Sequence, residues 1–139
     1  MRRGQGLLAV LLLAGAATAS EEASAQASPE RLQGAWATNA ATCDQVFTKR
    51  TGRLVFNKNS AEGWSGFIAT GKHIRSPNAS CDVISSKQKG DVLTFLLGCE
   101  SEIIFENVSV SVRFKPDGGL VRFDPEFPEV ETPYHRCDG

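Results

Sequence analysis

The sequence of 139 residues is poor in the side chains that most often carry catalysis. It contains only two His and one Tyr, and no nucleophile and base stand in a pattern that would assemble a catalytic site. No Cys-x-x-Cys or Cys/His pair has the spacing of a zinc site. We therefore expect a protein that is not an enzyme and that uses no metal or other cofactor.

Two further absences concern partners and membranes. Lys and Arg number 15 against 16 Asp and Glu, which gives a formal net charge of −1. Binding to a nucleic-acid backbone depends on clustered positive charge, so this balance argues against a nucleic-acid partner. The sequence also lacks a run of 18 apolar residues, so we expect no transmembrane helix.

The N-terminus has the pattern of an export signal. Arg2 and Arg3 provide positive charge, residues 7–17 are apolar, and small residues follow. These are the three parts of a secretory signal peptide. A short core helix is the poorer interpretation, because the charge, the apolar length and the small-residue exit all fit a signal.

Two positions fit signal cleavage, after Ala19 or after Ala27. We favour Ala27, because residues 20–27 are small and polar and have no reason to belong to a core. We therefore predict a signal peptide over residues 1–27 and a single domain over residues 28–139. The expected location is the periplasm or the exterior of the cell.

All four Cys lie in the part expected to be exported. An even number in a small exported domain predicts a disulfide framework. A hairpin centred on Gly90 would place Cys81 directly opposite Cys99, within the Cα separation that a disulfide requires. This pairing leaves Cys43 with Cys137, so we predict two disulfides.

The same hairpin register makes a second, finer prediction. Positions that sum to 180 should face each other, which sets Val83 opposite Leu97 and Ser85 opposite Phe95. The register therefore continues unbroken from the disulfide to the turn.

The rest of the chain alternates apolar and polar residues with the period of a β-strand. The alternation is clearest over residues 107–114, and Asp117-Gly118 then signals a tight hairpin turn. A two-residue turn there would set Phe114 opposite Val121 and Val112 opposite Phe123, with matching apolar faces.

Other segments complete an all-β pattern. We expect one helical turn near Pro29, a hairpin between residues 53–57 and 64–70, and further short strands over residues 34–38, 45–49 and 134–137. About eight strands with turns at this spacing predict an antiparallel up-and-down barrel or rolled sheet. Six bulky residues are expected to leave the interior mostly filled: Phe56, Phe67, Phe95, Phe105, Phe114 and Phe123.

The remaining polar candidates have ordinary explanations. We interpret His73 as a surface residue, because no acid or Cys stands at a useful spacing, and His135 as part of the closing strand. Even spacing would place Glu100, Glu102 and Glu106 on one solvated strand face rather than across a glycosidase cleft. We expect the acidic, proline-containing residues 124–131 to form a rigid loop. This segment lacks the spacing of oxygen ligands found in a calcium-binding EF-hand.

Gly34-Ala35-Trp36 resembles the Gly-x-Trp opening of the calycin superfamily, which includes lipocalins and the avidin-like and bacterial protease-inhibitor barrels. The resemblance implies that Trp36 closes one end of a barrel and packs against a basic residue from near the last strand. Arg136, or else Arg122, is the candidate for that residue.

Two narrower resemblances point to bacterial exported proteins. Residues 30–36 with Cys43 look like the start of small periplasmic metalloprotease inhibitors, although in those inhibitors the first Cys bonds to a nearby strand. Here no partner for Cys43 precedes Cys81. The early Trp and Cys and the Tyr-x-x-Cys ending also resemble short α-proteobacterial exported proteins.

These observations favour an exported, monomeric, non-catalytic binding module. Its partner would be a small apolar ligand or a component of the cell envelope. The alternative is an inhibitor of a protease or lysozyme that acts through its N-terminal segment or a loop. The state of the mature N-terminus distinguishes the two, because an inhibitor of the barrel kind would present a free, flexible strand there.

Overall fold

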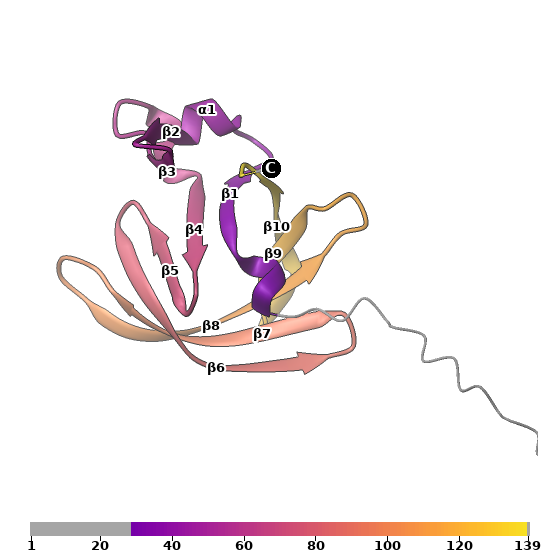
Figure 1. Cartoon of the computed structure of the whole chain (residues 1–139). Helices are drawn as coiled ribbons and strands as arrows, with labels where there is room; N and C mark the ends of the chain where they lie inside the picture. Colours follow the sequence, from indigo (N-terminus) through magenta and orange to yellow (C-terminus); the bar gives the residue numbers. More distant parts are fainter. Residues whose placement is uncertain (1–28, 139) are drawn as a thin grey trace, which may run out of the picture.

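The computed structural model describes residues 29–138, and the predicted signal peptide lies outside them (Figure 1). No helix in the described part is long and apolar enough to cross a membrane. With η for a 3-10 helix, the elements are η1 (Pro29–Leu32), β1 (Gly34–Thr38), α1 (Cys43–Val46), β2 (Phe47–Arg50), β3 (Arg53–Phe56), η2 (Ala61–Trp64), β4 (Gly66–Thr70), β5 (His73–Ser76), β6 (Ala79–Lys89), β7 (Val92–Glu100), β8 (Phe105–Phe114), β9 (Leu120–Asp124) and β10 (Phe127–Arg136).

Eight of these strands form a closed barrel in the order β1-β10-β9-β8-β7-β6-β5-β4. From β4 to β10 each strand pairs antiparallel with the next one in sequence, and β1 closes the barrel between β10 and β4. The disulfides join Cys43 to Cys137 and Cys81 to Cys99. The predicted all-β antiparallel barrel with two disulfides is therefore confirmed.

The hairpin predicted between residues 53–57 and 64–70 is wrong. β3 pairs instead with β2 in a separate two-stranded sheet, and β4 pairs with β1 and β5. The reason is a tight turn at Thr51 and Gly52, both with positive φ, which lets the nearest segments pair first. The strand expected at 45–49 likewise begins later, because a capping box of Thr42 and Gln45 starts α1.

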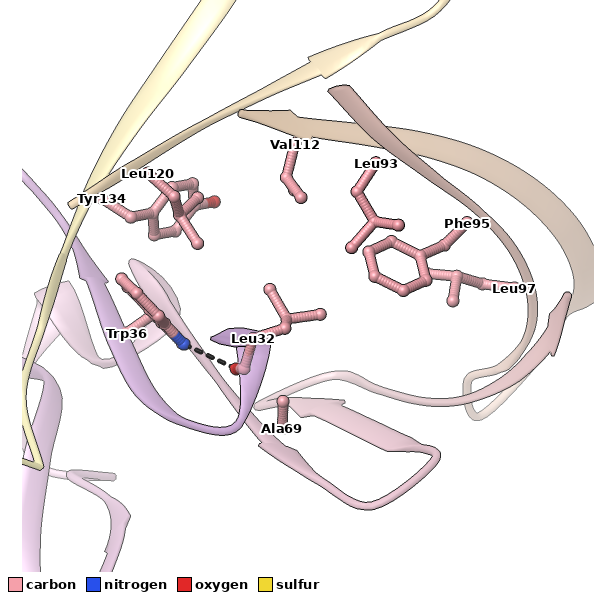
Figure 2. Close-up of a cluster of buried hydrophobic side chains, with 9 residues drawn as sticks. All are labelled: Leu32, Trp36, Ala69, Leu93, Phe95, Leu97, Val112, Leu120 and Tyr134. Atoms are coloured by element: carbon pink, nitrogen blue, oxygen red, sulfur yellow. Dashed lines mark hydrogen bonds between the residues drawn. The ribbon is translucent and has the colours of Figure 1, made fainter. Parts of the chain in front are cut away.

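Two apolar clusters lie on the two faces of the β1–β4 pair. Trp36 points into the barrel, where nine buried side chains meet (Figure 2). Ala35 and Ala37 point outward and pack against the buried Val46 and Phe47 of α1 and β2. Figure 1 shows α1, β2 and β3 grouped together outside the barrel. Small residues on the outer face of β1 thus allow the β2–β3 hairpin to pack closely.

The β6–β7 hairpin matches its predicted register only near the disulfide. Cys81 faces Cys99 and Val83 faces Leu97, but the register then shifts, and Ser85 faces Leu96 rather than Phe95. The turn is the two-residue Gly90-Asp91, with Gly90 at φ 61°. One extra residue must therefore bulge out of β6 before the cysteines can meet.

The β8–β9 register is also displaced by one residue from the prediction. Lys115 N–H donates to the Gly119 carbonyl at 2.8 Å, and Gly118 has φ 88°. These features define a three-residue loop with a bulge rather than a two-residue turn. Phe114 consequently faces Leu120, and Val112 faces Arg122.

That shift reverses the two faces of β9, because successive side chains alternate across a strand. Leu120 lies in the interior cluster, and Arg122 shares its face. Val121 and Phe123, which were expected inside, lie on the outer face. A charged side chain therefore lines the inner face of β9, where it stays exposed to solvent.

Candidate functional site

One end of the barrel is sealed around Trp36. The indole is fully buried, and its Nε1–H donates to the Leu32 carbonyl at 2.8 Å (Figure 2). The Arg136 guanidinium lies 4.3 Å from the indole ring centroid and donates to the carbonyls of Gln33 and Arg31 at 2.6 and 2.7 Å. η1 is thus held across the end of the barrel, which we call the closed end.

Gly34 belongs to the same arrangement. Its φ is 118°, and a Cβ there would lie 2.1 Å from Asp138 Oδ2 and 2.8 Å from Arg136 Nη1. A side chain at this position would displace the arginine from the indole. The three residues that the Gly-x-Trp resemblance assigns to closure, Gly34, Trp36 and Arg136, therefore lie together at the closed end.

Aromatic packing fills the barrel next to Trp36. The rings of Phe67 and Phe114 lie 6.3 and 6.4 Å from the indole, and Tyr134 packs edge-on against Phe67. The prediction of a filled interior holds for this half. Of the other expected interior rings, Phe95 is inside, whereas Phe56 packs in the outer cluster, Phe105 is exposed, and Phe123 lies beneath the Arg113 guanidinium on the outer face.

The opposite half of the interior is a cavity of about 390 Å³. This volume falls in the range of small-molecule pockets, about 300–1,000 Å³. Most of its lining is apolar, including the Cys81–Cys99 disulfide. The apolar side chains around it include Leu32, Phe67, Ile74, Phe95, Leu97, Val108, Val110 and Val112.

Arg122 supplies the positive charge of the cavity. It lies between Val112 and Thr132 on the inner face and lines the cavity. Within residues 29–138 its guanidinium has no hydrogen-bond or ion-pair partner. An arginine remains charged at any ordinary pH and presents several N–H donors. The cavity therefore combines apolar walls with two charged groups, the unpaired Arg122 guanidinium and the Glu106 carboxylate.

The cavity opens past Trp64, which is 64% exposed. Trp64, Asn78 and Ala79 also line an outer groove of about 670 Å³, which runs between η2, the β5–β6 turn and the β7–β8 turn. We call this side of the barrel the open end. A small ligand could reach the cavity from solvent through it.

The two histidines considered in the sequence lie outside the lining of the cavity. His73 does have an acid partner, contrary to expectation, because β5–β6 pairing sets it opposite Asp82 and their side chains form an ion pair. Both are about two-thirds exposed. No hydroxyl or thiol in residues 29–138 hydrogen-bonds to this histidine, so the pair lacks a nucleophile.

His135 lies within 4.8 Å of the sulfurs of Cys43 and Cys137. Metal binding by cysteine requires thiolates, and these two sulfurs are bonded to each other. The Nδ1 atom of His135 lies 3.3 Å from Asn39 Oδ1. The group is therefore a structural cluster beside a disulfide.

The predicted carboxylate face is wrong as well. The β7–β8 turn lies between Glu100 and Glu106, and only Glu106 lies on the inner face, opposite Cys99. The acidic segment expected as a loop instead leads into β10, which begins at Phe127 with an irregular register. Glu100 and Glu102 line the outer groove and Glu106 lines the cavity, so the three do not form one strand face.

Comparison with known protein families, curated proteins and solved structures finds no match to this chain. The site must therefore be interpreted from its own geometry. The decisive residue, Arg122, entered the sequence analysis only as an alternative closing residue. Its position depends on the β8–β9 register, which the turn sequence alone did not determine.

Proposed function

We propose that this protein is an exported, non-catalytic binding module that holds a small ligand in the open half of its barrel. The ligand would have an apolar body and a negatively charged or strongly accepting group. The observation that carries this proposal is Arg122, whose guanidinium is unpaired within residues 29–138 and lines an apolar cavity. Arg122 is exposed to solvent, and a guanidinium at the wall of an apolar cavity offers charged donors to a ligand with an acidic or accepting group.

The two disulfides support an exported location, because they persist in oxidising compartments such as the bacterial periplasm. The signal-like pattern of residues 1–27 agrees with this. The antiparallel eight-stranded barrel, with Trp36 beneath Arg136, supports kinship with calycin-type barrels. A barrel that is closed at one end by Trp36 and Arg136 leaves its other end available for ligand entry.

Inhibition of a protease or lysozyme through a free N-terminal strand has less support. η1 is anchored, because Leu32 is buried and Arg136 binds two of the adjacent carbonyls. An inhibitor built on this barrel would have to use the loops of the open end.

Two fluorescent probes test the proposal. Anilinonaphthalene sulfonate carries a negative charge, whereas N-phenylnaphthylamine has a similar apolar body without one. We expect the wild-type protein to bind both, and Arg122→Gln to weaken only the sulfonate by about tenfold or more, because a hydrogen bond to a charged group is worth about 1.5–3 kcal/mol. Arg50→Gln, on the exposed hairpin strand β2, is the matched control.

A second variant fills the cavity. Val110→Trp should reduce binding of both probes, since residue 110 lines the cavity. Unchanged binding in this folded variant would contradict the cavity as the ligand site. Equal loss of both probes in Arg122→Gln would contradict the role of its charge.

A further inference from the structure

β8 has a free edge along half of its length. It pairs with β7 over residues 105–113, whereas it pairs with β9 only over residues 111–114. Figure 1 shows β9 and β10 diverging from the long β8 beyond that point. The edge formed by residues 105–110 has no backbone partner on its second side within residues 29–138.

The backbone groups on this edge can be identified. Ser101 N–H donates to the Ile104 carbonyl at the β7–β8 turn, which fixes the alternation of the β7–β8 ladder. In an antiparallel pair, successive residues direct their N–H and C=O groups to opposite sides. Phe105, Asn107 and Ser109 therefore direct their N–H and C=O groups away from β7.

A groove of about 310 Å³ lies beside this edge. Ser109 and Val110 form one wall, and Phe127 and Val130 contribute to the other. Phe127 and Val130 are 57% and 66% exposed. The groove therefore offers apolar surface next to unpaired backbone donors and acceptors, a combination that suits an added β-strand.

The two chain segments that contribute to the groove are acidic in sequence, and Asp124 lines the groove itself. Residues 100–110 and 123–131 contain seven carboxylates and no Lys or Arg. Among these carboxylates, Glu131 forms an ion pair with Arg113. Arg122, at the inner end, carries the one positive charge among the lining residues of the groove. The chain as a whole is nearly neutral, so this negative charge is a local property of the edge.

We propose that the free edge of β8 binds an extended segment of another protein, in which basic residues alternate with apolar ones. The segment would pair with Asn107 and Ser109 through its backbone, place apolar side chains against Phe127 and Val130, and face the acidic segments with its basic side chains. Like charge disfavours both an anionic membrane surface and a second copy of this edge. This site adjoins the proposed ligand cavity, because Val110 and Arg122 line both.

Synthetic peptides of about six residues test the proposal directly. Acetyl-(Lys-Val)₃-amide should bind at least about tenfold more tightly than its Glu-Val counterpart, as measured by ¹H–¹⁵N NMR titration. The amide signals of Phe105, Asn107 and Ser109 should shift. Methylating alternate peptide nitrogens, on the edge that pairs with β8, should reduce affinity about tenfold, because it removes ladder donors and keeps the charge.

A protein variant gives the same test from the other side. Asn107→Pro removes one free-edge N–H without removing a bond to β7 and should weaken the Lys-Val peptide about tenfold. Arg50→Gln, on the exposed strand β2 away from the groove, should leave the peptide affinity unchanged. Absence of binding, or equal binding of the methylated peptide, would overturn the proposal. Self-association of the protein that Asn107→Pro abolishes would also overturn it, by making a second copy the occupant.

Discussion

The closed and open ends of this barrel use the same kinds of residue for opposite purposes. At the closed end Arg136 stacks on the buried Trp36 and donates to two backbone carbonyls. In the cavity that leads to the open end, Arg122 has unused donors within residues 29–138, and Trp64 on the same lining is mostly exposed. An arginine whose donors are satisfied by the protein is structural, whereas an arginine without protein partners beside a cavity is a candidate for binding.

The largest expected contrast separates the two tryptophans. Trp36→Ala should destabilise the protein by about 3–5 kcal/mol, because it leaves a cavity in a filled core. Trp64→Ala should change stability by about 0.5 kcal/mol or less, because the side chain is mostly in solvent. Urea unfolding followed by circular dichroism measures both. Similar losses in the two variants would show that the open end is also a structural core.

The two disulfides also divide between the ends. Cys43–Cys137 ties α1 to the end of β10 and encloses 94 residues, whereas Cys81–Cys99 in the cavity wall encloses 18. Chain entropy predicts a stabilisation of about 4.7 kcal/mol for the long loop and about 3 for the short one. Paired Cys→Ser variants in urea unfolding test this order. Reversal of the order would mean that strain or residual structure outweighs loop entropy.

The arginines provide a smaller contrast. Arg136→Gln should destabilise the protein by about 1–3 kcal/mol, because two carbonyls lose a charged donor. Arg122→Gln should change stability by less than about 0.5 kcal/mol, and its effect should instead fall on probe binding. Thermal unfolding and probe titration of both variants test the separation. A large stability loss in Arg122→Gln would assign this residue to the fold.

The smallest expected effect concerns the β8–β9 loop. Gly119 N–H donates to the Asp117 carboxylate and holds its pKa below the ordinary aspartate range, with Lys115 assisting. Because the pKa of Asp117 is lower in the folded state than in the unfolded state, its ionised carboxylate stabilises the fold at a pH above the ordinary aspartate pKa. This stabilisation is lost as the pH falls through the folded-state pKa. Asp117→Asn should therefore unfold at a slightly lower temperature than wild type at pH 6.

The matching measurement is made in acid. As the pH falls through the folded-state pKa of Asp117, its carboxyl becomes protonated, and the difference between the unfolding temperatures of the two proteins should shrink. If the difference in unfolding temperature between wild type and Asp117→Asn stayed the same in acid, the effect would come from the shape of the side chain rather than from its charge. The comparison isolates charge because asparagine keeps an oxygen at the same position.

The sequence predicted well those features whose signals are local. Gly34 and Trp36 lie in one short motif, and the alternation over residues 107–114 is unambiguous. The pairing of Cys81 with Cys99 also followed from a short hairpin. Each of these features depends on residues close together in the chain.

The open end was harder because it depends on strand registers. A turn at Asp117-Gly118 is compatible with two or three loop residues, and the choice decides whether Arg122 or Phe123 enters the barrel. The bulge in β6 and the separate β2–β3 sheet likewise reflect competition between turns. A one-residue error in register exchanges the interior and exterior faces of a strand, which is why the cavity and its arginine could not be predicted.

The most direct test of the contrast between the ends is an NMR titration with anilinonaphthalene sulfonate that follows the arginine Nε–H signals. The account predicts that the Arg122 signal shifts as the probe binds, with backbone shifts at cavity residues such as Val108 and Val110. The Arg136 signal, already held over Trp36, should remain in place. Movement of Arg136 with no movement of Arg122 would contradict the assignment of ligand binding to the open end.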